Sequence, residues 1–96
     1  MNKTNIIEII RNEKPYLHSK FGVEEIGLFG SYARGEEKED SDVDLLIKFK
    51  IKTLANLCDM YDYLQSKLNK KIDIVSKHDR LSPNFLKLVN MDIIYA

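Results

Sequence analysis

Isoleucines and other apolar residues recur at nearly helical spacing between residues 4 and 21, which predicts an amphipathic first helix. We expect Thr4 to cap this helix, because a threonine hydroxyl can accept a hydrogen bond from a free N–H of the first turn. Gly22 is placed where a glycine ends a helix. Pro15 lies inside the segment and lacks a backbone donor, so the sequence also predicts a kink over residues 11–15.

The rest of the chain alternates between strand-like and helix-like patterns. Short apolar segments with strand character occur at residues 24–29, 42–49, 71–76 and 92–95. Residues 53–68 carry a strong apolar stripe that predicts a second long helix, with Cys58 on the stripe and therefore expected to be buried. Ser82-Pro83 opens a short helix predicted to reach residue 88. This order indicates an α/β or α+β sheet domain.

Length and charge limit the classes of function. The 96 residues allow one domain, 1–96, and 15 basic residues balance 15 acidic ones. Zero net charge argues against a general nucleic-acid binder, which needs a basic surface. The single cysteine excludes an internal disulfide framework, and no apolar run approaches the length of a membrane span. We therefore expect a cytoplasmic protein that does not associate with membranes.

The first candidate for chemistry is the Gly30-Ser31 pair at the end of a predicted strand, followed by Arg34. A small residue there lets backbone N–H groups approach phosphate oxygens, and the guanidinium of Arg34 matches the geometry of phosphate. Taken alone, the pair is also compatible with an ordinary turn, since glycine and serine are common in turns.

The second candidate is a set of three aspartates. Asp42 and Asp44 open a strand two residues apart, so their side chains share a face and can converge on a hard cation such as Mg²⁺. The competing interpretation is that Asp42 caps the start of the strand and that Asp44 faces solvent. Asp73 lies in an apolar strand and, taken alone, fits an edge position. Three carboxylates at one end of a sheet are best explained by a metal site, because they repel one another without cations. Lys77, just beyond the Asp73 strand, is either solvated or near a phosphate.

Together these features resemble the nucleotidyltransferase superfamily typified by DNA polymerase β, kanamycin nucleotidyltransferase and poly(A) polymerase. Gly30-Ser-Tyr-Ala-Arg-Gly35 with Ser41-Asp-Val-Asp-Leu45 is most similar to the minimal nucleotidyltransferase (MNT) domain, and the likeness extends over residues 21–76. Members of that family are about this long and are often encoded beside an all-helical HEPN protein as antitoxin and toxin. The resemblance implies a mixed sheet of about four strands with helices packed on it.

The resemblance also implies roles for individual residues. Gly30 and Ser31 would hold the β- and γ-phosphates of a nucleoside triphosphate, and Arg34 would contact the same triphosphate. Asp42, Asp44 and Asp73 would bind two Mg²⁺ ions and act as the catalytic residues, with Asp73 helping to activate the acceptor hydroxyl. The chain lacks the helical domain of larger members, so we expect a partner to supply that part.

By this resemblance the chain is a nucleotidyltransferase that transfers AMP from ATP to a hydroxyl group of a HEPN-type toxin. Family analogy implies that the hydroxyl belongs to a tyrosine. The chain would thereby act as the antitoxin. Two alternatives remain open. The chain could neutralise its partner by binding alone, or it could modify a small molecule such as an aminoglycoside. The acidic loop 36–40 would repel nucleic acid and favours a protein or small-molecule acceptor.

Overall fold

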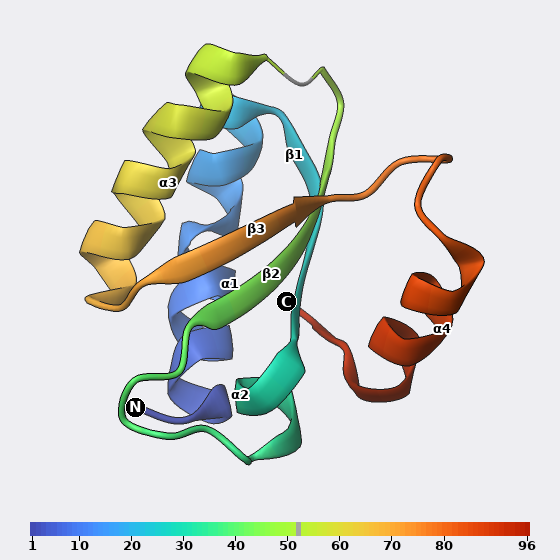
Figure 1. The fold of residues 1–96 in the computed structure, drawn as a ribbon. Coiled ribbons are helices and arrows are strands. Elements are labelled where there is room, and N and C mark those ends of the chain that lie inside the picture. Colours follow the sequence, from blue (N-terminus) through green and yellow to red (C-terminus); the bar gives the residue numbers. More distant parts are fainter. Residues whose placement is uncertain (52) are drawn as a thin grey trace.

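The structure, a computed structural model, describes residues 1–51 and 53–96. Helices and strands follow one another in the order α1 (Lys3–Phe21), β1 (Val23–Phe29), α2 (Gly30–Arg34), β2 (Val43–Phe49), α3 (Leu54–Leu68), β3 (Ile72–Ser76), α4 (Pro83–Asp92) and β4 (Ile94–Tyr95). The strands form one mixed sheet in the order β3-β2-β1-β4 (Figure 1). β1 is antiparallel to β2 and β4, whereas β2 and β3 are parallel. The predicted four-stranded mixed sheet with packed helices is confirmed.

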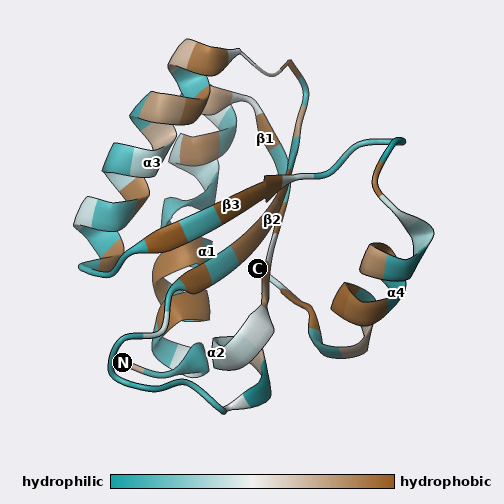
Figure 2. Ribbon diagram, viewed as in Figure 1, coloured by the Kyte–Doolittle hydropathy of each residue, from teal (hydrophilic) through white to brown (hydrophobic). Residues whose placement is uncertain are grey.

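The long helices α1 and α3 pack side by side against one face of the sheet (Figure 1). Apolar residues follow the strands and the inner sides of these helices, whereas loops and outer helix surfaces are hydrophilic (Figure 2). Val43, Leu45 and Ile47 of β2 join this core, as their alternation predicts. Leu46 points to the opposite face and is only 1% exposed, so the central strand is covered on both sides.

A side-chain cap begins α1, and a glycine in left-handed conformation ends it. Asn2, and not the predicted Thr4, is the N-cap: its side chain accepts a hydrogen bond from the Asn5 N–H, and the Asn5 side chain accepts one from the Asn2 N–H. This reciprocal pair satisfies two donors at the helix start, which a threonine inside the first turn cannot do. Gly22 ends the helix with φ +70°, as predicted. Pro15 does not interrupt the helix.

α3 begins after Thr53, whose hydroxyl accepts a hydrogen bond from the Asn56 N–H, and Asn69 ends it in the left-handed conformation. The predicted bounds are therefore confirmed to within a residue. The predicted burial of Cys58 is wrong, because this residue is exposed. The apolar stripe that reaches the sheet runs through Met60, Leu64 and Leu68, which turns position 58 outward.

The chain after residue 80 differs most from expectation. α4 continues to Asp92 where the sequence predicted an end near residue 88, and the expected strand over 92–95 is limited to Ile94–Tyr95. The extra turn forms because Val89 is buried and its carbonyl accepts the Ile93 N–H. α4 lies apart from the two long helices and packs against α2 (Figure 1). Within the described residues, none of the helices is both long and apolar enough to cross a membrane.

Candidate active site

The Gly30-Ser31 motif lies at the junction of β1 and α2. The chain leaves β1 in extended conformation at Phe29, and Gly30 then takes φ +77° to start a helix of 5 residues. The sequence offered a phosphate-binding segment or an ordinary turn here and did not predict the helix. Tyr32 and Ala33 are buried in the core, and this anchors the junction.

The predicted acids are carried by two parallel neighbouring strands. Asp44 of β2 is in register with Asp73 of β3, and the preceding pair Val43 and Ile72 is buried. Residues in register on neighbouring strands share a face, so the two aspartates lie on the sheet face opposite α1 and α3. Asp42 lies just before β2 and is partly buried, whereas Asp73 is exposed.

Gly30 and Asp44 are in direct contact across the β1–β2 pairing. Phe29 is the register partner of Asp44, which brings the next residue beside the carboxylate. A β-carbon on Gly30 would collide with Asp44 Oδ2 and lie 3.0 Å from its Cγ. The backbone at Gly30 therefore lies so close to the Asp44 carboxylate that only a glycine fits at this position.

The site places excess negative charge around Asp44. Burial is the largest cause that raises the pKa of the Asp44 carboxyl above its usual range, followed by the charges of Asp73 and Asp42. The charge of Arg34 acts in the opposite direction and lowers that pKa. Burial and the two neighbouring acids thus outweigh the opposing charge of Arg34 at this carboxylate.

Asp42, Asp44 and Asp73 are not grouped closely enough to bind a metal ion through all three carboxylates. Across residues 1–51 and 53–96, no three Asp, Glu, His or Cys side chains are grouped closely enough to hold a metal ion. Mg²⁺ does not require such a set, because it takes one or two carboxylates and completes its shell with phosphate oxygens and water. The Asp44–Asp73 pair therefore suits Mg²⁺ chemically, with Asp42 available at the strand entrance.

Arg34 lies at the other end of α2 and is flanked by carboxylates. Its Nε is 3.6 Å from Glu36 Oε2, and its Nη1 is 3.6 Å from Asp92 Oδ2 of α4. It lines a cleft of about 200 Å³ between α2 and α4, together with Phe29, Gly30, Phe85, Leu88, Val89 and Asp92. Phe29 and Phe85 meet edge to face across it, with ring centroids 6.0 Å apart. Nothing in the sequence pointed to Asp92, since its pattern placed this residue at the start of a last strand and not at the end of α4.

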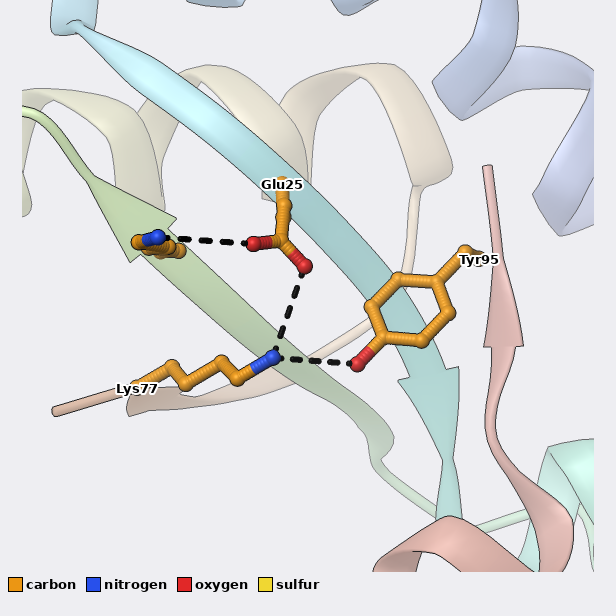
Figure 3. Close-up of polar contacts among 4 residues, drawn as sticks. Glu25, Lys77 and Tyr95 are labelled. Atoms are coloured by element: carbon orange, nitrogen blue, oxygen red, sulfur yellow. Dashed lines mark hydrogen bonds and ion pairs between the residues drawn. The ribbon is translucent and has the colours of Figure 1, made fainter. Parts of the chain in front are cut away.

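Lys77 contacts side chains of β1 and β4. Its Nζ is 3.4 Å from Glu25 Oε1 of β1 and donates to Tyr95 Oη of β4 at 3.4 Å (Figure 3). Lys48 pairs with the other oxygen of Glu25 at 3.7 Å. The hydrogen bond with Tyr95 is the main cause that raises the pKa of the Lys77 amine. The lysine connects strands on the sheet surface four residues beyond Asp73.

Comparisons with known proteins identify the family of this chain. The profile of the nucleotidyltransferase domain family matches residues 7–95. Protein adenylyltransferase MntA of Thermococcus cleftensis is 42% identical over 92 residues, which cover 95% of this chain and 92% of that protein. A solved structure assigned as a minimal nucleotidyltransferase has a TM-score of 0.78 and 33% identity, and the match covers 98% of this chain and 95% of that one.

A more distant solved structure shares the fold. It is a complex of a tri-AMPylated HEPN toxin from Shewanella oneidensis with an MNT antitoxin. The matching chain has a TM-score of 0.57 and 20% identity, and the match covers 96% of this chain and 66% of that one. The family profile and the near full-length relative together confirm the class of enzyme that the motif predicted. This chain belongs to the nucleotidyltransferase domain family, among its minimal members.

Proposed function

We propose that this chain is a Mg²⁺-dependent protein adenylyltransferase that transfers AMP from ATP to a hydroxyl of a HEPN-type toxin and so acts as its antitoxin. The near full-length similarity to a protein adenylyltransferase supports the reaction class. The shared fold with an MNT antitoxin supports the role and the partner. The observation that carries the proposal is the contact of Gly30 with Asp44, which is itself in register with Asp73.

Each site residue has a proposed part in binding. Gly30 and Ser31 would take the β- and γ-phosphates, because only a glycine allows such close backbone approach beside the acid. Arg34 would add its planar guanidinium to the same phosphates. Asp42, Asp44 and Asp73 would hold two Mg²⁺ ions. Bound Mg²⁺ would neutralise the carboxylates and stabilise the charge on the reacting oxygens.

The proposed chemistry balances with the groups present. The acceptor oxygen bonds to the α-phosphorus, the bond from that phosphorus to pyrophosphate breaks, and the hydroxyl proton passes to the Asp73 carboxylate. Asp73 is exposed, so an acceptor on the surface of a large molecule can reach it. This exposure favours a protein acceptor, and we propose a tyrosine hydroxyl. The proposal places the reaction in the cytoplasm, where ATP and Mg²⁺ are available.

Co-expression of the chain with the HEPN-type toxin proposed as its partner tests the proposal. Intact-mass measurement of the partner should show one or more added AMP groups, and peptide mapping should locate them on tyrosine. The Asp42→Ala/Asp44→Ala double variant should add none. Asp40→Ala is the matched control, because it removes an exposed loop acid and should leave transfer intact.

Three outcomes would contradict the proposal. A partner of unchanged mass after co-expression with the wild-type chain would exclude transfer. Full neutralisation by the double variant at matched abundance would instead support inhibition by binding alone. Resistance to an aminoglycoside conferred by the chain without its partner would identify a small-molecule acceptor.

A further inference from the structure

The side chain of Arg34 extends toward the glycine motif. Gly30 and Arg34 are four residues apart in α2, so they share one face of this single turn. Side chains in a helix lean toward its N-terminal end, which directs the guanidinium back over Gly30. Both residues accordingly line the same cleft between α2 and α4.

The guanidinium is flanked by carboxylates but not bonded to them. Asp92 Oδ2 approaches Nη1 and Glu36 Oε2 approaches Nε, each at 3.6 Å. These distances exceed a normal hydrogen bond. Within the described part of the chain, the Arg34 side chain takes part in no hydrogen bond, so its N–H donors are free for a ligand.

Asp92 is in an unfavourable position for the helix that carries it. It is the last residue of α4, where the partial negative charge of the helix end disfavours a carboxylate. The last turn of α4 contains no basic residue to offset it. Its charge partner, Arg34, belongs to α2. This indicates that the carboxylate of Asp92 interacts favourably with Arg34 and does not stabilise α4.

We propose that Asp92 is a positioning residue for nucleotide binding, which holds the Arg34 guanidinium over Gly30 with its donors directed to the triphosphate. This inference rests on the proposed function. Asp92 is the stronger candidate of the two flanking acids, because its side chain is 33% exposed and that of Glu36 is 67% exposed. Water screens the more exposed pair more fully.

Calorimetric titration of the purified chain with ATP and Mg²⁺ tests the inference. Asp92→Asn should weaken ATP binding about two- to fivefold, the range of an exposed ion pair converted to affinity. AMP lacks the β- and γ-phosphates, so its weaker binding should be unaffected. Asp92→Glu should recover most of the loss, and Glu36→Gln should change ATP affinity less than Asp92→Asn.

A double-variant cycle separates positioning from a structural effect. If Asp92 acts through Arg34, Asp92→Asn should cause no further loss in an Arg34→Gln background. Thermal melting of each variant checks that α4 remains folded, and loss of the helix-end acid should not lower the melting temperature. Tighter or unchanged ATP binding by Asp92→Asn would overturn the inference, as would an additive loss in the double variant.

The same titration distinguishes the two levels of the proposal. If the wild-type chain fails to bind ATP with Mg²⁺, the proposed function and this inference fall together. If the wild type binds ATP and Asp92→Asn binds it equally well, only the positioning role of Asp92 is refuted.

Discussion

The backbone of Gly30 touches the carboxylate of Asp44, so that any β-carbon at position 30 would overlap Asp44 Oδ2. The contact arises because β1 and β2 pair in a register that sets Phe29 opposite Asp44. It joins the glycine motif and the first strand acid into one unit, although several exposed loop residues separate them in the chain.

Gly30→Ala should abolish AMP transfer and ATP binding. The new methyl group would displace the Asp44 carboxylate, and φ +77° would strain the backbone. Left-handed backbone at a non-glycine residue costs roughly 1–2 kcal/mol, and the collision adds to that. Chemical denaturation and ATP titration of the variant measure both effects.

Gly35→Ala is a matched control for this experiment. Gly35 has a similar φ of +72°, but a β-carbon there would meet nothing within 4 Å. This variant should lose about 1–2 kcal/mol of folding free energy and keep ATP binding. Equal functional loss in both variants would show that backbone strain, and not the contact with Asp44, explains the need for glycine.

Asp44→Asn should stabilise the chain at neutral pH in the presence of a chelator. The pKa of Asp44 is raised in the folded state, so ionising it there carries a penalty that the unfolded state lacks. The penalty is full above the folded-state pKa and vanishes as pH falls below the usual 3.8. Urea unfolding at several pH values should show the advantage of the variant fading toward acid. A variant less stable than wild type at pH 7 would refute the electrostatic explanation.

The contact between α1 and α3 includes a hydrogen bond from Tyr63 Oη to the Glu13 carboxylate. This bond is the main cause that raises the pKa of Tyr63 to about 12. Because the folded-state pKa lies above the usual 10.0, stability from this bond should be present below pH 10 and lost as pH rises through 12. Ultraviolet titration should detect a late-titrating tyrosinate that Tyr63→Phe removes.

Tyr16→Phe is the control for Tyr63. The Tyr16 ring stacks on Tyr63 with centroids 4.8 Å apart, and its hydroxyl forms no hydrogen bond with a described residue. This variant should preserve both stability and the late titration. If it abolishes the late titration, the shift comes from the charge of the Tyr16 hydroxyl and not from Glu13.

Pro15→Ala should raise the free energy of unfolding by about 1–3 kcal/mol, because α1 continues through Pro15 and the missing donor is a net cost. Urea denaturation measures the change, and AMP transfer should be unaltered. Ser19→Ala, on the same exposed part of α1, should gain less than about 0.7 kcal/mol. An unchanged stability in Pro15→Ala would indicate that the helix has already adapted to the proline.

Much of the fold was predictable because its signals are local. The stripe over 53–68 and the alternation of Val43, Leu45 and Ile47 follow from helix and strand periods, and the structure reproduces both to within a residue. Ends that depend on competing local bonds were less predictable. Asn2 and not Thr4 is the cap because a reciprocal pair with Asn5 satisfies two donors. α4 extends beyond its expected end, where Val89 is buried and its carbonyl accepts the Ile93 N–H.

The site was predictable as a set of residues and not as an arrangement. The spacing of Asp42 and Asp44 and the following strand acid were enough to indicate a metal- and nucleotide-binding motif. They did not indicate that Asp44 would be the acid closest to Gly30, or that Lys77 would be engaged by Glu25 and Tyr95.

By itself the sequence determined the family and the identity of the motif residues, because both follow from residue types and their spacing along the chain. It also determined most element positions, because periodicity depends on neighbours a few places away. Only the tertiary structure decided which strands pair and in what register. That pairing set Asp73 beside Asp44 and Gly30 against it, and it brought Asp92 to Arg34. The physical reason is that a side chain's environment comes from contacts between distant segments, which burial of the whole core selects together.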